Sequence, residues 1–337
     1  HTSMRRYSRI TGTGSYLPPR RLTNQDLAAE LAQRGVETSD EWIVERTGIR
    51  ARHFAAPDVT SSDLGFEAAR RALEAAGLAP QDIDLIIVAT STPDLTFPPT
   101  AALVQGGLGA KRAAAFDLNA VCSGFLQAYV TAAQFIQTGA YRHVLVIGAE
   151  TLSRIVDYED RSTCILFGDG AGAAVLSRTS EDVGLIDFVL HADGTRAGLV
   201  YCPSPTSPEA TLKSIGGIAK PTIRQDGRAV FKFAVNGMSE SVLTLLERNG
   251  LRSEDVRLLV PHQANLRIMT AVAERVGVPV ERTANCIAEY GNTSAATIPL
   301  ALHKWFHTEG LQKGDLVVFT AFASGFLWGA ALLRWGM

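Results

Sequence analysis

Three residues far apart in the chain, Cys122, His262 and Asn292, have the side chains of a nucleophile and two hydrogen-bonding groups. A thiol can form a covalent intermediate, and an imidazole and a carboxamide can stabilise charge that develops on a substrate oxygen. Each residue stands in a turn beside an apolar strand or a helix. Because such turns gather at strand ends in α/β proteins, we expect the three side chains to lie together.

Cys122 lies where a predicted strand turns into a predicted helix. Small and apolar residues over 113–118 indicate a short buried strand, and apolar residues at helical spacing predict a helix over 123–138. The unpaired N–H groups and positive end of such a helix stabilise a thiolate, which makes Cys122 a candidate nucleophile. A buried cysteine that packs as a small hydrophobic residue is the alternative, and this stretch alone does not decide between them.

The other two candidates differ in how strongly their surroundings indicate chemistry. His262 lies between an apolar strand, Leu258–Pro261, and a helix predicted over Leu266–Val276, where a purely structural histidine has little purpose. Asn292 alone would be an ordinary turn residue. His303 and His307 have the spacing of zinc ligands but lack the intervening Glu of a metalloprotease, so we expect surface or partner contacts and no metal site.

Composition restricts the class of protein. The chain has 337 residues, 46% hydrophobic and 20% charged, with a net charge of −2. This is typical of an ordinary globular protein with a large core and does not indicate binding to nucleic acid or to a membrane surface. Four cysteines without a C-x-x-C pair indicate reduced thiols in the cytoplasm. We expect no signal peptide and no membrane span, and we interpret residues 1–3 as an expression remnant.

The two halves of the chain resemble one another. A polar break over 179–184 divides it into a predicted N-terminal half, 4–178, which carries the Cys, and a C-terminal half, 179–337, which carries the His and Asn. Three pairs of segments match in character and order: Gly170–Leu176 with Trp328–Leu333, Leu85–Ala89 with Leu258–Pro261, and Asn119–Gly124 with Gly291–Ser294. This pattern predicts an internal duplication with functional loops where the halves meet.

Two glycine-rich segments do not bind phosphate in this interpretation. The segment over 10–17 lacks the third glycine of a dinucleotide fingerprint and is followed by two prolines. The segment over 167–172 continues as a strand, whereas a phosphate-binding loop leads into a helix. Near Trp42, three arginines (Arg46, Arg50 and Arg52) form a basic cluster that could hold an adenine and phosphates, although a solvated helix end is the simpler interpretation.

Several longer motifs resemble those of the bacterial β-ketoacyl-(acyl carrier protein) synthase III family, within the thiolase-like superfamily. The motifs are DLNAVCSGF, VPHQANLRI, EYGNTSAATIPLAL, FGDGAGAAVL and TSDEWIVERTGI, and the resemblance extends from Ile10 to Trp335. It implies an α/β thiolase-like fold with duplicated βαβαβαββ halves in a layered αβαβα architecture. It also implies an acyltransferase that starts fatty-acid synthesis.

The resemblance implies a mechanism in two stages. Cys122 would be acylated by a short acyl-CoA, which is a substrate and not a cofactor, and no other cofactor is implied. Malonyl-(acyl carrier protein) would then lose carbon dioxide while His262 and Asn292 donate hydrogen bonds to the enolate. Backbone N–H groups of Cys122 and Ser324 would hold the oxyanion during attack on the acyl group.

The resemblance also implies binding residues and a homodimer. Acyl-CoA would contact Thr38, Trp42, Arg46 and Arg161. The acyl pocket would contain Leu152 and Phe167, together with Phe97 of the partner subunit. The acyl carrier protein would bind Lys232, Gln263, Ala264, Asn265, Leu266 and Arg267, with Arg275 nearby.

Two positions depart from the family pattern, and other functions stay open. Ala323-Ser324-Gly325 replaces three consecutive glycines, and Arg228 replaces an Asn that commonly contacts CoA. A related condensing enzyme that makes a polyketide or quinolone starter would carry the same Cys-His-Asn set. A papain-like thiol hydrolase is disfavoured by the duplicated pattern and the absence of C-G-S-C-W around Cys122, and a binding-only role is the weakest interpretation.

Overall fold

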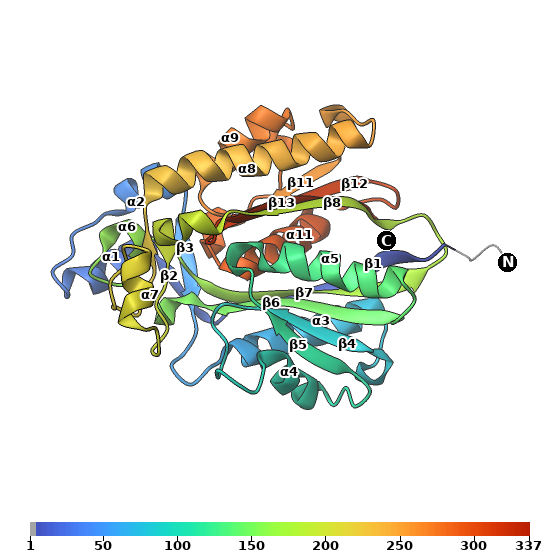
Figure 1. Ribbon diagram of the computed structural model, residues 1–337, viewed down its shortest axis with the longest axis horizontal. Coiled ribbons are helices and arrows are strands. Elements are labelled where there is room, and N and C mark those ends of the chain that lie inside the picture. The colour runs from blue at the N-terminus through green and yellow to red at the C-terminus, as the bar shows by residue number, and fades with distance from the viewer. Residues whose placement is uncertain (1–4) are drawn as a thin grey trace.

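The computed structural model describes residues 5–337, so the predicted expression remnant lies outside the described part of the chain. Two β-sheets alternate with three layers of helices (Figure 1). This is the αβαβα layering expected from the sequence. No helix within residues 5–337 is both long enough and apolar enough to cross a membrane.

The first sheet has five strands in the order β1-β7-β6-β4-β5. Strands β4, β5 and β6 are parallel, whereas β1 and β6 each pair with β7 in antiparallel fashion. All five residues of β4 are buried because helices cover both faces of the sheet. The bounds are β1 (Tyr7–Tyr16), β4 (Leu85–Ala89), β5 (Ala114–Leu118), β6 (His143–Thr151) and β7 (Asp169–Thr179).

The second sheet repeats this arrangement with one strand fewer. Its order is β8-β13-β12-β11, and a single parallel bridge between Leu259 and Thr283 stands where the first sheet has β5. The predicted duplication is therefore present in the topology, although the halves are unequal. The bounds are β8 (Gly184–Ala192), β11 (Leu258–Pro261), β12 (Leu316–Ala323) and β13 (Leu327–Arg334). The division into domains at 178/179 stays a prediction.

Six helices make up the three layers. Two lie between the sheets, α5 (Gly124–Gln137) and α11 (Thr297–Thr308), and pack into the central core. Two cover the outer face of the first sheet, α3 (Ser61–Ala76) and α4 (Thr100–Leu108). The outer face of the second sheet is covered by α8 (Gly227–Arg248) and α9 (Leu266–Val276). Each pair buries its apolar face against a sheet.

Shorter elements surround the active-site end of the sheets. Several of them contribute to a peripheral apolar cluster that also includes Leu152 and Phe167. The bounds are β2 (Arg20–Thr23), α1 (Asn24–Ala32), α2 (Asp40–Thr47), β3 (Ala51–Phe54), α6 (Arg161–Cys164), β9 (Val200–Tyr201), α7 (Glu209–Ser214), β10 (Arg224–Gln225) and α10 (Ile287–Tyr290).

The starts of the two central helices pack tightly against each other. A 3-10 turn precedes each helix: η2 (Val121–Ser123) leads into α5, and η7 (Ser294–Ala296) leads into α11. A Cβ atom added at Gly148 would lie 2.2 Å from the carbonyl oxygen of Ala295. A Cβ atom at Gly124 would lie 3.0 Å from the Cβ of Ala295. Glycine at these positions permits η7 to approach both β6 and the start of α5 closely.

We expect Gly148→Ala to destabilise the protein, because its methyl group would overlap the backbone of η7. The loss should be about 1–3 kcal/mol or more, as for other overpacked cores. Gly106→Ala is the matched control, since a Cβ atom there meets no heavy atom within 4 Å and the residue lies in α4. The control should be neutral or stabilise by about 0.5–1 kcal/mol. Thermal and urea unfolding would measure the stability of both variants. Equal free energies of unfolding for Gly148→Ala and Gly106→Ala would contradict the close packing inferred at Gly148.

Candidate active site

Cys122 lies in η2, between the end of β5 and the start of α5. The predicted helix therefore begins at Gly124, two residues after the cysteine. The preceding residue, Val121, has a φ of 51°, a left-handed conformation that is strained for a β-branched side chain. Ser294, which occupies the equivalent position in η7, has a φ of 52°. The two corresponding turns therefore share the same unusual backbone.

Burial opposes the stabilisation of a thiolate that the helix start gives to Cys122. Burial raises the pKa of the Cys122 thiol to about 12, and the negative charge of Glu150 acts in the same direction. The hydroxyl of Ser294 lowers this pKa but does not offset burial. The thiol is therefore protonated at neutral pH, because desolvation at this helix start exceeds the stabilisation that a helix terminus provides.

His262 follows β11 and is almost fully buried. Its backbone N–H donates to the carbonyl of Thr320 at 2.7 Å, and its Nδ1 lies 2.6 Å from the hydroxyl oxygen of Thr297. Burial lowers the pKa of His262 to about 3, so the ring is neutral at physiological pH. Because Thr297 occupies Nδ1, Nε2 is the ring nitrogen left for a substrate.

Hydrogen bonds hold both the backbone and the side chain of Asn292 in place. Its N–H donates to Leu166 O at 2.8 Å, and its carbonyl accepts from Gly168 N at 3.0 Å. The side-chain Oδ1 accepts from Ser294 N at 2.8 Å. The NH₂ group, at the opposite end of the carboxamide, is therefore oriented by a bond from the η7 turn.

The segment Asn292–Thr297 thus contacts the whole candidate set. Ser294 holds the Asn292 amide, Thr297 holds the His262 ring, and η7 packs against the turn that carries Cys122. The Thr297 hydroxyl also lies 3.0 Å from the carbonyl oxygen of Ser294. This segment belongs to a motif that resembles the family, but the sequence alone did not predict the roles of Ser294 and Thr297. Small hydroxyl residues directly after a candidate Asn were the available signal.

Ser324 lies in the turn that joins β12 to β13. Its hydroxyl donates to the carbonyl of Val200 at 2.6 Å. Phe326, two residues further along the same turn, exchanges two backbone hydrogen bonds with Asp193, of 2.7 and 2.8 Å. The departure from three glycines therefore adds a side-chain bond that tethers this turn to the 193–200 segment.

The predicted CoA residues gather around Trp42. The guanidinium carbons of Arg46 and Arg161 lie 4.5 and 4.4 Å from the centre of the Trp42 ring. Arg161 thus lies directly over the Trp42 ring, and its guanidinium also donates to the carbonyl of Glu37 at 3.1 Å. Thr38 is partly buried in the segment that precedes α2. Arg52 does not belong to this cluster, because it is fully buried and bonded to Asn24 and to the carbonyl of Ile165.

The predicted acyl-pocket residues fall into two environments. Leu152 and Phe167 are buried in the same apolar cluster. The backbone of Phe167 pairs with that of Asn292 in an isolated parallel β-bridge. Phe97, in contrast, is 81% exposed in the loop before α4. An apolar side chain of this size and exposure is of the kind that packs against a partner.

The predicted carrier-protein residues are only partly on the surface. Lys232 and Arg267 are exposed, whereas Gln263 is fully buried. Gln263 donates to the carbonyls of Pro261 and Ala284 and accepts from Cys286 N. Its inclusion as a carrier contact is therefore wrong: the polar side chain serves internal hydrogen bonds.

Two of the other residues have structural contacts of their own: Asn265 caps α9, and Arg275 bonds to Asn236. Ala264 and Leu266 are partly exposed.

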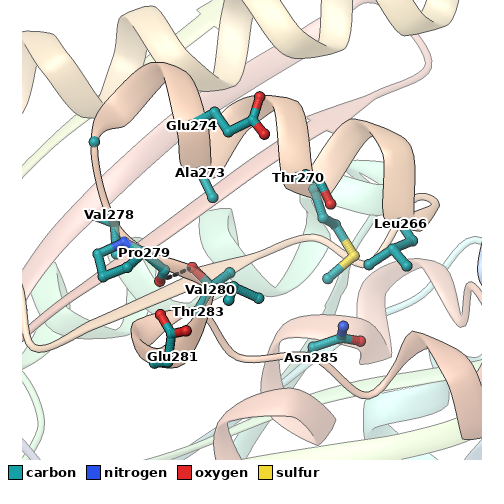
Figure 2. A pocket seen from close by; sticks show the side chains of 12 residues that line it. Leu266, Thr270, Ala273, Glu274, Val278, Pro279, Val280, Glu281, Thr283 and Asn285 are labelled. Carbon is teal, nitrogen blue, oxygen red and sulfur yellow. Dashed lines mark hydrogen bonds between the residues drawn. The ribbon is translucent and has the colours of Figure 1, made fainter.

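A groove of about 670 Å³ runs along α9 and the 278–285 segment, with Leu266 at one end (Figure 2). The residues that line it are mostly apolar, with Glu274 and Glu281 at its edges, and none is Cys122, His262 or Asn292.

His303, considered above as a surface histidine, instead bonds to Thr13 at 2.8 Å. Within residues 5–337, no group of three metal-ligating side chains is placed to hold a metal ion.

Solved structures of known enzymes resemble this chain over nearly its whole length. The 3-oxoacyl-[acyl-carrier-protein] synthase III of Aquifex aeolicus is 45% identical, with 97% of this chain and 100% of that chain covered and a TM-score of 0.89. The synthase III of Thermus thermophilus is 46% identical, with 97% and 99% covered and a TM-score of 0.90. A priming β-ketosynthase of the R1128 polyketide pathway is 36% identical, with 100% and 98% covered and a TM-score of 0.90.

Family models match both halves of the chain. The model of 3-oxoacyl-[acyl-carrier-protein (ACP)] synthase III matches residues 116–194, which contain Cys122, and the model of its C-terminal part matches residues 246–335, which contain His262 and Asn292. With identities of 45% and 46% to two solved synthases III, the chain belongs to the 3-oxoacyl-[acyl-carrier-protein] synthase III family.

Proposed function

We propose that this enzyme joins a short acyl group from acyl-CoA to a malonyl group carried by acyl carrier protein, releasing carbon dioxide and CoA. As a member of its family, it is an acyltransferase that performs the initiating condensation of fatty-acid synthesis. The observation that carries the proposal is the Asn292–Thr297 segment, which contacts the surroundings of Cys122, His262 and Asn292 together.

In the first stage Cys122 attacks the acyl-CoA carbonyl and retains the acyl group as a thioester. The thiol is deprotonated in this step, because only the thiolate is a good nucleophile. The backbone N–H groups of Cys122 and Ser324 hold the oxygen of the tetrahedral intermediate. Support for Ser324 comes from the bonds that fix its turn, since an oxyanion hole works by holding its donors in place beforehand.

In the second stage malonyl-(acyl carrier protein) loses carbon dioxide, and the resulting enolate attacks the acyl group on Cys122. His262 and Asn292 donate hydrogen bonds to the enolate oxygen. A neutral His262 donates through Nε2 in the tautomer whose Nδ1 accepts the Thr297 hydroxyl proton, which this hydroxyl otherwise gives to the carbonyl of Ser294. The backbone and side-chain bonds of Asn292 support a fixed donor in the same place.

The proposal also assigns the substrate-binding residues, the oligomeric state and the compartment of the enzyme. Acyl-CoA binds through Thr38, Trp42, Arg46 and Arg161, and the acyl pocket contains Leu152 and Phe167. The basic residues Lys232 and Arg267 are exposed and suit an acidic carrier protein. We propose a cytoplasmic homodimer that uses no cofactor; the four free cysteines support a reducing compartment.

Priming of polyketide synthesis is the second candidate function. It is favoured by the 36% identity to the R1128 priming β-ketosynthase over the whole chain. The higher identities to fatty-acid synthases III favour the first function. Acylation by a panel of acyl-CoAs, followed by intact mass, would separate the two through the preferred primer and the carrier protein accepted.

Cys122 should be the residue that becomes acylated. Cys164 and Cys286 are buried in apolar clusters, whereas Cys122 is only partly buried and Cys202 is exposed. In a Cys202→Ser background, peptide mapping after exposure to acyl-CoA should place one acyl group on Cys122. Cys122→Ala should abolish condensation without a change in melting temperature. An acyl group found on another residue would contradict the assignment.

His262→Ala and Asn292→Ala should separate the two half-reactions. Both variants should still acylate Cys122, but release of carbon dioxide from the malonyl donor should fall by about 10²–10³-fold, as for loss of one fixed donor. Since the folded pKa of His262 lies at about 3, wild-type decarboxylation should show no loss from His262 protonation between pH 8 and 5. Equal loss of both half-reactions in the Asn292 variant would contradict this division.

Phe97→Ala should change the preferred acyl length without abolishing turnover, because the proposal places this side chain in the partner's acyl pocket. Val280→Ala is the control, since Val280 is also a well-exposed apolar residue, 68% exposed, but lies in the α9 groove. Competition between short and longer acyl-CoAs would measure the preference. A fully active monomer in sedimentation experiments would refute the dimeric acyl pocket.

A further inference from the structure

A short antiparallel pair of strands, β9 and β10, ties together the two ends of the segment 199–226, which we call the strap. Gln225 pairs with Val200 in this ladder. Beside it, the backbone N–H of Asp226 donates to the carbonyl of Leu199 at 2.8 Å. Between these ends the chain forms α7 and the loops on either side of it. Because an isolated pair of short strands is at best marginally stable in water, the strap needs anchors elsewhere in the fold.

The first anchor of the strap is the carboxylate of Asp157, in the loop before α6. The side chain is only 7% exposed, and its Oδ2 lies 2.8 Å from Lys220 Nζ and 3.5 Å from Arg224 Nη2. The backbone N–H of Ile223, between these two cations, donates to the carbonyl of Ile155 at 2.8 Å. Two cations of the strap thus converge on one nearly buried carboxylate, and to break such a contact costs more than to break an ion pair in solvent.

This anchor lies on the side of the site to which the proposed function assigns acyl-CoA. Ile223 belongs to the peripheral apolar cluster that contains Phe167, and Trp42 packs against the same cluster. The loop that contains Asp157 continues into α6, which begins with Arg161. The strap is therefore attached to the part of the fold that carries the predicted CoA and acyl contacts.

The second anchor is the hydroxyl of Ser324, in the turn that joins β12 to β13. It donates to the carbonyl of Val200 at 2.6 Å, and Val200 is the residue of β9 that pairs with Gln225. A glycine, which the family pattern has at this position, could not make this bond. The hydroxyl therefore attaches the turn of the proposed oxyanion donor to the ladder of the strap.

We propose that Asp157 is a positioning residue, which acts through the strap to hold the backbone N–H of Ser324 where the oxyanion forms. The proposal rests on the proposed function, because that function gives the Ser324 N–H its role. A contiguous path of contacts carries the effect: Asp157 holds Arg224, and the β9–β10 ladder holds Val200, whose carbonyl holds the Ser324 hydroxyl. An oxyanion hole works by holding its donors in place beforehand, so loss of the anchor should weaken it.

The two half-reactions should differ in their dependence on the strap. Acylation passes through a tetrahedral intermediate, whose oxygen the Ser324 N–H would hold. The enolate of decarboxylation would instead be held by His262 and Asn292, whose side-chain partners lie in the Asn292–Thr297 segment. A fault in the strap should therefore slow acylation and leave decarboxylation unchanged, whereas a general loss of structure would slow both.

The test is a double-mutant cycle with Asp157→Asn and Ser324→Ala, read as the single-turnover rate of Cys122 acylation at saturating acyl-CoA. Acetyl-, butyryl- and isobutyryl-CoA are tried on the wild type, and the fastest is used throughout. Each single variant should acylate about 10-fold more slowly, less than the 10²–10³-fold of a lost oxyanion donor, because the N–H is still present. The double variant should lose no more than the slower single variant, since both changes release the same turn.

Asp187→Asn is the matched control for the loss of a carboxylate. Asp187 is also partly buried and bonded to an arginine, Arg248, but it lies on β8, outside the strap. This variant should acylate at the wild-type rate. Decarboxylation of malonyl-(acyl carrier protein) is measured for each strap variant in a Cys122→Ala background, and its rate should equal that of the background alone.

Four results would overturn the role of the strap. They are losses that multiply in the double variant, as for independent sites, acylation at the wild-type rate in either single variant, a raised requirement for acyl-CoA at an unchanged maximal rate, and an equal loss of decarboxylation. If Asp157→Asn does not fold, Lys220→Met takes its place in the cycle. A wild type that no acyl-CoA acylates would instead refute the proposed function, whereas an active wild type with any of the four results would refute the strap alone.

Discussion

The close packing of two helix starts is the constraint on which the active site depends. Turn η7 contacts the turn of Cys122, and two glycines, Gly124 and Gly148, leave the space that its backbone needs. From this position Ser294 bonds to Asn292 and Thr297 contacts His262. Side chains from both halves of the duplicated fold are thereby held by one short segment, without a flexible loop between them.

Burial has the largest effect on the chemistry of this site. It raises the pKa of Cys122 to about 12 and lowers that of His262 to about 3, so both groups are uncharged at rest. A neutral imidazole suits hydrogen-bond donation to an enolate, whereas a neutral thiol needs a base before it can attack. Burial therefore sets the His262 ring in the form that decarboxylation needs, whereas the Cys122 thiol must lose its proton before it attacks acyl-CoA.

Much of the framework could be predicted from the sequence because burial on both faces leaves a clear apolar pattern. Strands Leu85–Ala89 and Leu258–Pro261 and helix Leu266–Val276 have the predicted bounds. Side-chain environments were less predictable: Gln263 and Arg52 are polar yet fully buried, because internal carbonyls and Asn24 bind them. The missing fifth strand of the second sheet, and the contacts of Ser294, depend on tertiary packing that periodicity does not contain.

The most direct measurement is a reconstituted condensation in which the product is identified by mass. Purified enzyme would receive a short acyl-CoA with malonyl-(acyl carrier protein), and in parallel the same acyl group on carrier protein or the malonyl group on CoA. The account predicts that β-ketoacyl-(acyl carrier protein) forms from acyl-CoA and malonyl-(acyl carrier protein), one carbon dioxide per product, and is lost with Cys122→Ala. Product that forms only from the acylated carrier protein, or hydrolysis of acyl-CoA without condensation, would contradict it.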